Sequence, residues 1–123
     1  MISTEDGFRN YLLSVEALYA ILLPELKANA EKYLDLARLL YLYYREYFDK
    51  RRKHLDVSEV KKKIEDVKAK LPNNVLEKIS SSPSIYHWLA FIVDLALEEM
   101  LKKLNEAGLL LGGKKVTVKL AGK

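Results

Sequence analysis

The sequence predicts an all-α, mainly helical fold, a bundle of about four to five helices with a long central helix and a small C-terminal β-hairpin. Apolar residues recur every three or four positions over most of the chain, which is the period of an amphipathic helix. Proline and glycine separate these segments, and only the end of the chain alternates as a strand does. The length of 123 residues fits one hydrophobic core. We therefore expect a single domain over residues 1–123, divided into a helical bundle (1–108) and a basic hairpin tail (109–123).

A first helix is predicted over residues 4–22. Ser3 and Asp6 have the spacing of a weak capping box at its start. One stripe of this helix is apolar and consists of Phe8, Tyr11, Leu12, Val15, Leu18, Tyr19 and Leu22. Pro24 cannot continue the helix, because proline has no backbone N–H to donate.

A second, longer helix is predicted over residues 24–54, with Pro24 in its first turn. Between Tyr33 and Phe48 this helix is apolar nearly all the way round, so we expect it to be the central element and to contact several neighbours. The residues expected in the core from the two longest helices are Tyr33, Leu40, Tyr44, Leu89, Ile92 and Ala96.

The next part of the chain predicts a third helix and a short helical turn. Asp56 or Ser58 can cap the third helix, and Pro72 ends it. Its apolar stripe consists of Val57, Val60, Ile64, Val67 and Leu71, while its other positions are mostly charged. Residues 73–82 then indicate a short helical turn followed by a polar loop.

The last long helix is predicted to have Ser82 as its cap, Pro83 at its first position and Gly108 as its end. His87 and Asp94 both lie on its polar stripe, about 10 Å apart along the axis, which is too far for a direct hydrogen bond. We expect His87 to be solvated or partly packed and to have no catalytic role.

The tail after Gly108 predicts a small basic hairpin. Val116, Val118 and Leu120 alternate with polar residues beyond a pair of glycines. An isolated two-stranded hairpin is marginal in water. We therefore expect the tail to pack on the bundle or to pair with another chain, which favours self-association or assembly into a larger complex.

The charge of the chain is strongly one-sided. The formal net charge is +4, but residues 1–49 hold five basic and eight acidic side chains, whereas residues 50–123 hold sixteen and nine. Such asymmetry is typical of a protein with a polyanionic or negatively charged partner. Glutamine is absent and lysine and glutamate are abundant, which is the composition typical of a thermophile.

The most distinctive feature is the basic run at the predicted end of the second helix. Cations there complement the helix dipole, which is one explanation of the run. The five consecutive residues of the run, Lys50 to His54, also encircle the helix, so we expect this end to protrude beyond the core, where it can reach phosphates. Aromatic residues precede the run, as they do in proteins that bind single strands. The candidate nucleic-acid-binding residues here are Arg45, Lys50, Arg51, Arg52 and Lys53.

Two weaker basic groups lie further along the chain. Lys62 and Lys63 belong to the third helix, where acidic residues lie among the lysines, so a solvated mixed-charge face is the alternative interpretation. Lys114 and Lys115 begin the predicted hairpin, and no acidic residue lies near them. They are candidates for contact with a nucleic-acid backbone, or they protect the sheet edge against aggregation.

The sequence excludes most enzymatic chemistry. There is no cysteine, and the two histidines lie in no metal-binding motif. No glycine-rich phosphate loop and no nucleophile elbow is present either. No apolar run is long enough to span a membrane. We therefore expect a soluble, cytoplasmic protein that is not an enzyme and needs no metal or cofactor.

In size and character, over most of its length, this chain resembles the small subunits of CRISPR interference complexes, in particular the archaeal Cascade-type subunit. The resemblance lies in the number of helices, the protruding basic end, the basic hairpin and the thermophilic composition. It implies a helical, non-catalytic antiviral-defence subunit that stacks in several copies along RNA and DNA and holds their backbones. The alternative is a helical adaptor, or a virus or plasmid accessory protein, that acts through protein contacts.

Overall fold

The computed structural model describes residues 4–79 and 81–108, and that part of the chain contains five α-helices and one 3-10 turn. The elements are α1 (Glu5–Ile21), η1 (Pro24–Leu26), α2 (Ala30–Arg52), α3 (Ser58–Lys68), α4 (Asn73–Leu76) and α5 (Ile85–Glu106). The predicted mainly helical bundle is confirmed. The hairpin predicted over residues 109–123 lies outside the described residues.

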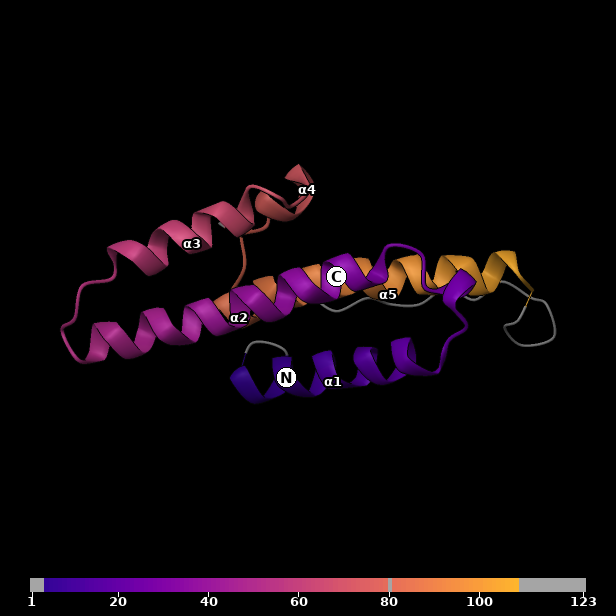
Figure 1. The fold of residues 1–123 in the computed structure, drawn as a ribbon, viewed down its shortest axis with the longest axis horizontal. Coiled ribbons are helices and arrows are strands. Elements are labelled where there is room, and N and C mark those ends of the chain that lie inside the picture. The colour runs from indigo at the N-terminus through magenta and orange to yellow at the C-terminus, as the bar shows by residue number, and fades with distance from the viewer. Residues whose placement is uncertain (1–3, 80, 109–123) are drawn as a thin grey trace.

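The helix α2 is the central element of the bundle, as predicted. It runs antiparallel to α5 and packs along it, while α1 lies against both helices (Figure 1). The chain then reverses at the end of α2, and α3 returns along the second half of that helix (Figure 1). This arrangement gives α2 neighbours on three sides. No helix within residues 4–79 and 81–108 combines the length and the apolar character needed to cross a membrane.

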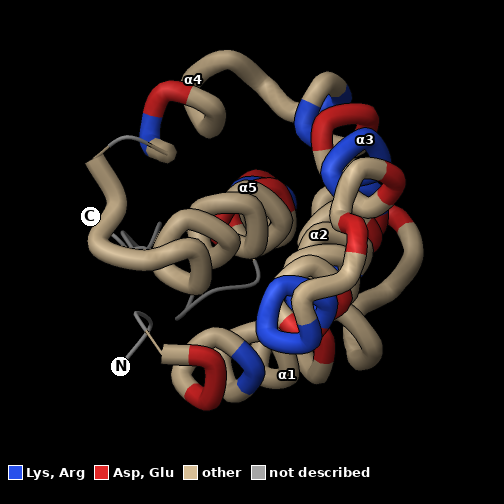
Figure 2. The backbone as a smooth tube through the Cα atoms, turned by 90° about the vertical axis from the view of Figure 1, so that its left-hand side faces the viewer, with Lys and Arg blue, Asp and Glu red and all other residues tan. Residues whose placement is uncertain are grey.

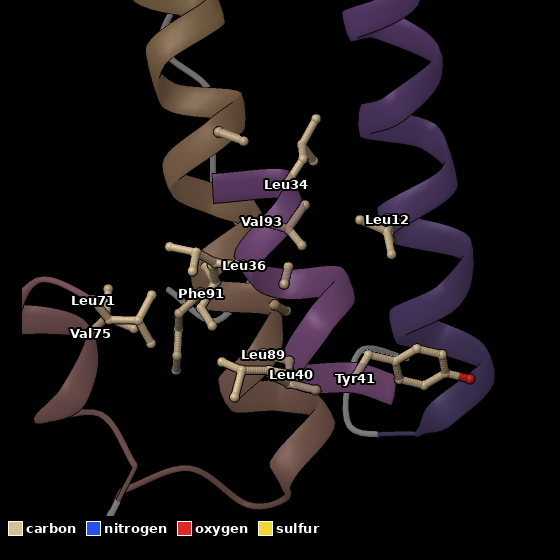
Figure 3. Close-up of a cluster of buried hydrophobic side chains, with 14 of the residues drawn as sticks. Leu12, Leu34, Leu36, Leu40, Tyr41, Leu71, Val75, Leu89, Phe91 and Val93 are labelled. Atoms are coloured by element: carbon tan, nitrogen blue, oxygen red, sulfur yellow. The ribbon is translucent and has the colours of Figure 1, made fainter. Parts of the chain in front are cut away.

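The hydrophobic core lies where α1, α2 and α5 meet, and residues from α3 and α4 extend it (Figure 3). Its largest fully buried side chains are Trp88, Phe8, Leu34, Leu40, Leu89, Ile92, Met100, Val60, Val75 and Val93. The core prediction is confirmed for Leu40, Leu89, Ile92 and Ala96. It is wrong in part for Tyr33 and Tyr44, which are only half-buried because they pack at the edge of the core.

The central helix is shorter than predicted, because it begins at Ala30 and not at Pro24. Pro24 starts a 3-10 turn, and Ala28 then adopts a φ of 49°, in the left-handed region. A helix beginning at Pro24 would leave only two residues to reverse the chain between the antiparallel helices α1 and α2. The longer connection makes that reversal and still buries Leu26 against the core.

The helix starts also differ from the prediction by one or two residues. Thr4 caps α1 in place of Ser3, since its Oγ1 accepts a hydrogen bond from the backbone N–H of Gly7 at 3.0 Å. Ser84 caps α5 in place of Ser82, because its Oγ accepts from the backbone N–H of His87 at 3.2 Å. Pro83 therefore lies just before the cap and outside the helix.

Candidate nucleic-acid interface

The C-terminal end of α2 extends beyond α1 and α5 (Figure 1). Viewed from that side, Lys and Arg surround the last turn of α2, and basic and acidic residues alternate along α3 (Figure 2). Lys50 is half-buried, while Arg51, Arg52 and Lys53 are exposed. We call Lys50–Lys53 of α2 together with Lys61–Lys63 of α3 the basic tip.

The end of α2 is a Schellman motif built on a histidine. His54 adopts a φ of 58°, and its N–H donates to the carbonyl of Arg51 at 3.1 Å. The N–H of Leu55 donates to the carbonyl of Lys50 at 2.9 Å. These are the two hydrogen bonds that satisfy the last carbonyls of such a helix. The chain therefore turns away sharply, and the basic side chains stay at the negative end of the helix dipole.

Three cations of the basic tip form ion pairs within α2. Lys50 Nζ lies 3.1 Å from Glu46 Oε2, while Arg52 and Lys53 each lie 3.1 Å from a carboxylate oxygen of Asp49. The hydrogen bond from Lys53, together with the charge of Arg52, holds the pKa of the Asp49 carboxyl below its usual value. Asp49 and Glu46 are acidic partners of the basic run that reasoning on the run alone missed, although their i,i+3 and i,i+4 spacing could have identified them.

Arg51 differs from the other cations of this run because it pairs with no carboxylate within the described residues. Its guanidinium carbon lies 5.6 Å from the centre of the Tyr47 ring, and its Nη1 donates to the Tyr47 hydroxyl at 3.5 Å. A guanidinium over an aromatic ring is held in place while its outer N–H groups stay available. Arg51 is therefore the cation of the tip best placed to bind an anion.

Two hollows flank the aromatic residues of the tip. One is shallow, has a volume of about 310 Å³, and is lined by Phe48, Arg51 and Arg52. The other, of about 170 Å³, lies between α2 and α3 and is lined by Tyr44, Tyr47, Lys61, Ile64 and Glu65. Tyr47 connects Arg51 of α2 with Lys61 of α3. The Arg51 guanidinium packs on the Tyr47 ring, and Lys61 lines the hollow between α2 and α3 together with Tyr47. Lys61 belongs to α3, and the packing of α3 on α2 brings it to the aromatic residues.

The lysines of α3 differ among themselves. Lys63 Nζ lies 3.9 Å from Glu59 Oε1 and 5.8 Å from the centre of the Tyr43 ring. Lys62 is exposed and forms no ion pair within the part of the chain that the structure describes. Lys63 therefore has an acidic neighbour on its own helix, while Lys62 is available for an external anion.

Arg45 is directed to another contact. Its Nε lies 3.9 Å from Glu5 Oε2 in α1, and its guanidinium carbon lies 5.8 Å from the Tyr41 ring centre. The same carboxylate accepts a hydrogen bond from the Tyr41 hydroxyl at 2.6 Å. Burial, reinforced by this hydrogen bond to Glu5, raises the pKa of Tyr41 above its usual value. Arg45 therefore helps to join α2 to α1 and is a weaker candidate for phosphate contact.

His87 lies in the first turn of α5. His87 is half-buried, and its ring centre lies 5.2 Å from that of Phe91, so the expected partial packing is what the structure shows. No group of three or more His, Cys, Asp or Glu side chains that could hold a metal ion occurs among residues 4–79 and 81–108. Lys114 and Lys115 lie outside the described residues. No family model, curated protein or solved structure matches this chain.

Proposed function

We propose that this chain is a non-catalytic nucleic-acid-binding subunit of a larger cytoplasmic complex, and that the basic tip holds an RNA or DNA backbone. The observation that carries the proposal is Arg51, an exposed guanidinium held on Tyr47 with no carboxylate partner in the described part of the chain. Arginine forms strong, bidentate hydrogen bonds with phosphate. The end of a helix that extends beyond its bundle allows a long polyanion to approach without colliding with the rest of the protein.

The ion pairs of the tip are compatible with this function. Exposed pairs such as Arg52 with Asp49 contribute little to stability, so little free energy opposes their exchange for a phosphate. Each contact with a phosphate releases a condensed counterion, which favours binding at low salt. The positive charge of the second part of the chain adds an attraction that does not depend on sequence.

The resemblance to the small subunits of CRISPR interference complexes supports the setting of this function. Such a subunit would contact other subunits and further copies of itself while several basic tips follow one nucleic-acid backbone. Affinity would then arise from many weak sites, and one copy alone would bind modestly.

A helical adaptor, or a virus or plasmid accessory protein, is the second candidate, favoured by exposed apolar residues on other surfaces. Leu39 and Leu42 are 38% and 55% exposed on α2, and Leu13 and Ile21 are 61% and 79% exposed on α1. Leucine and isoleucine at such exposures suit contact with a protein partner. In this case the basic tip would be a solvated helix end.

A salt titration separates the two functions. The test variant carries Arg51→Ala and Arg52→Ala, and the control carries Lys27→Ala and Lys32→Ala near the start of α2. Both variants lower the net charge of +4 equally. Filter binding to short single strands and duplexes is measured over a range of salt concentrations. We expect the test variant to lose about 1.4 from the slope of log K against log[salt] on single strands and about 1.8 on duplexes.

The control variant should keep the slope of the natural protein, because its two lysines lie at the opposite end of α2. Equal slopes in all three proteins would exclude the basic tip as a nucleic-acid interface and favour the adaptor function. Circular dichroism checks that the variants are folded, since the cations contribute to stability mainly through the helix dipole.

A further inference from the structure

We infer that the basic tip binds single-stranded nucleic acid by stacking one unpaired base on Phe48, while Arg51 and Arg52 contact the adjoining phosphates. The inference rests on the proposed function and specifies its substrate class. It starts from an exposed aromatic side chain, since Phe48 is 36% exposed and lines a hollow together with Arg51 and Arg52.

The Phe48 ring is supported by other rings. Its centre lies 6.2 Å from that of Tyr44, with 29° between the ring planes, and 5.5 Å from that of Tyr47 in an edge-on arrangement. These are favourable aromatic geometries. The remaining surface of Phe48 lines the shallow hollow of about 310 Å³, which no other residue within the described chain fills. The exposed part of an aromatic ring that other rings support thus lines a hollow at the tip.

The support of Phe48 extends into the core. Tyr44 meets Trp88 edge-on, with 6.3 Å between the ring centres. Trp88 is 1% exposed, and its Nε1 donates to the carbonyl of Val75 at 2.9 Å. The rings of Trp88, Tyr44 and Phe48 therefore form a continuous series from the core to the surface. A base that stacks on Phe48 meets a surface that is already ordered, so binding costs little conformational entropy.

The charges around the hollow select the ligand. An apolar side chain of a protein partner would also fit Phe48, but it would remove water from the Arg51 guanidinium without giving it an anionic partner, which is unfavourable. A nucleotide offers a flat ring and a phosphate together, and both parts are matched here. Bases within a duplex are stacked and paired, so only an unpaired base can reach Phe48.

The test uses the intact chain and three variants. Phe48→Leu removes the aromatic face and keeps an apolar side chain, Phe48→Trp keeps an aromatic face, and Leu55→Ala removes a neighbouring apolar side chain that is 55% exposed. Calorimetry measures binding of short single strands, abasic strands of the same length, and duplexes. We expect Phe48→Leu to weaken single-strand binding roughly 5- to 100-fold, the effect of one stacked base. Phe48→Trp should restore the affinity, and Leu55→Ala should leave it unchanged.

Abasic strands and duplexes identify the cause. Phe48→Leu should not weaken binding to either of them, since neither presents an unpaired base. Loss of single-strand affinity in the Arg51, Arg52 variant but not in Phe48→Leu would overturn base stacking and leave the proposed function standing. Equal losses on single strands and duplexes in Phe48→Leu would likewise overturn stacking. An affinity that neither variant changes would overturn both the stacking and the proposed function.

Discussion

The hydroxyl of Tyr11 in α1 donates a hydrogen bond to the carboxylate of Asp94 in α5, and it thereby joins two helices across the edge of the core. Asp94 is 4% exposed and is the one buried charged residue within residues 4–79 and 81–108. We predict that Tyr11→Phe lowers the free energy of unfolding by about 1–3 kcal/mol, because a buried carboxylate loses a donor. Urea denaturation measures this change. Tyr43→Phe serves as the control, since that half-buried hydroxyl forms no hydrogen bond within the described chain, and equal stability of the two variants would contradict the prediction.

The pKa of Tyr44 predicts a loss of stability at high pH. Burial, assisted by the charge of Glu65, raises the pKa of Tyr44 to about 12. The folded state therefore holds this proton more tightly than the unfolded state does. The contribution is present below pH 10 and is lost as the pH rises from about 10 to about 12. Denaturation at pH 9, 10, 11 and 12 should show a smaller alkaline loss in Tyr44→Phe than in the natural protein.

Removal of an acidic residue at the basic tip should strengthen nucleic-acid binding. Asp49 pairs with Arg52 and Lys53, so Asp49→Asn frees two cations and removes a charge that repels phosphate. We predict affinity for single strands about 2- to 5-fold higher at low salt. Asp35→Asn is the matched control, because Asp35 pairs with Arg38 on the same helix, three residues away. An equal gain in both variants would indicate an effect of net charge and not of the tip.

The histidine that ends α2 predicts a stabilising substitution. His54 holds a φ of 58°, where any side chain is strained and glycine is not. We predict that His54→Gly raises the free energy of unfolding by about 0.5–1 kcal/mol, despite the greater freedom of glycine in the unfolded chain. His54→Ala separates this backbone effect from loss of the imidazole. Thermal unfolding in which the alanine and glycine variants coincide would contradict the explanation.

Deletion of residues 109–123 should weaken assembly more than it weakens folding. Among the described residues, the core cluster runs from Phe8 to Met100 and is formed by the helices of the bundle. We predict that the shortened chain keeps its helical circular dichroism, while sedimentation shows less self-association. A shortened chain that self-associates as the full chain does would refute a role of the tail in assembly.

The sequence was sufficient for the helical bundle because apolar periodicity reports which face of a helix is buried. The period correctly placed Phe8, Val15 and Ile64 in the core. It was not sufficient for the break before α2, because Ala28 adopts a left-handed φ that nothing in its type indicates. The burial of Asp94 was not predicted from the sequence for another reason. A polar residue on a helix suggests a solvated face, whereas in the folded chain Tyr11 from α1 reaches Asp94 and donates a hydrogen bond to it.

The positive charge of the candidate site was predictable from the sequence, but the ion pairs that its cations form were not. The run that includes Arg51 is plain in the sequence, and so is the protrusion of its helix. The identity of the cation that has no carboxylate partner depends on side-chain rotamers and on the position of α3. Both are properties of the folded chain. The hollow beside Phe48 likewise requires the rings of Tyr44 and Tyr47 to be placed by the core.

The ring series from Trp88 to Phe48 also gives the molecule a natural optical probe. Trp88 is the only tryptophan among eight tyrosines, and it is buried beside Tyr44 with Lys68 Nζ 5.8 Å from its ring centre. Light absorbed by Tyr44 is readily transferred to an indole at this separation. Fluorescence emission from Trp88 thus reports both the integrity of the core and any change at the tip. Both can be observed without attaching a dye.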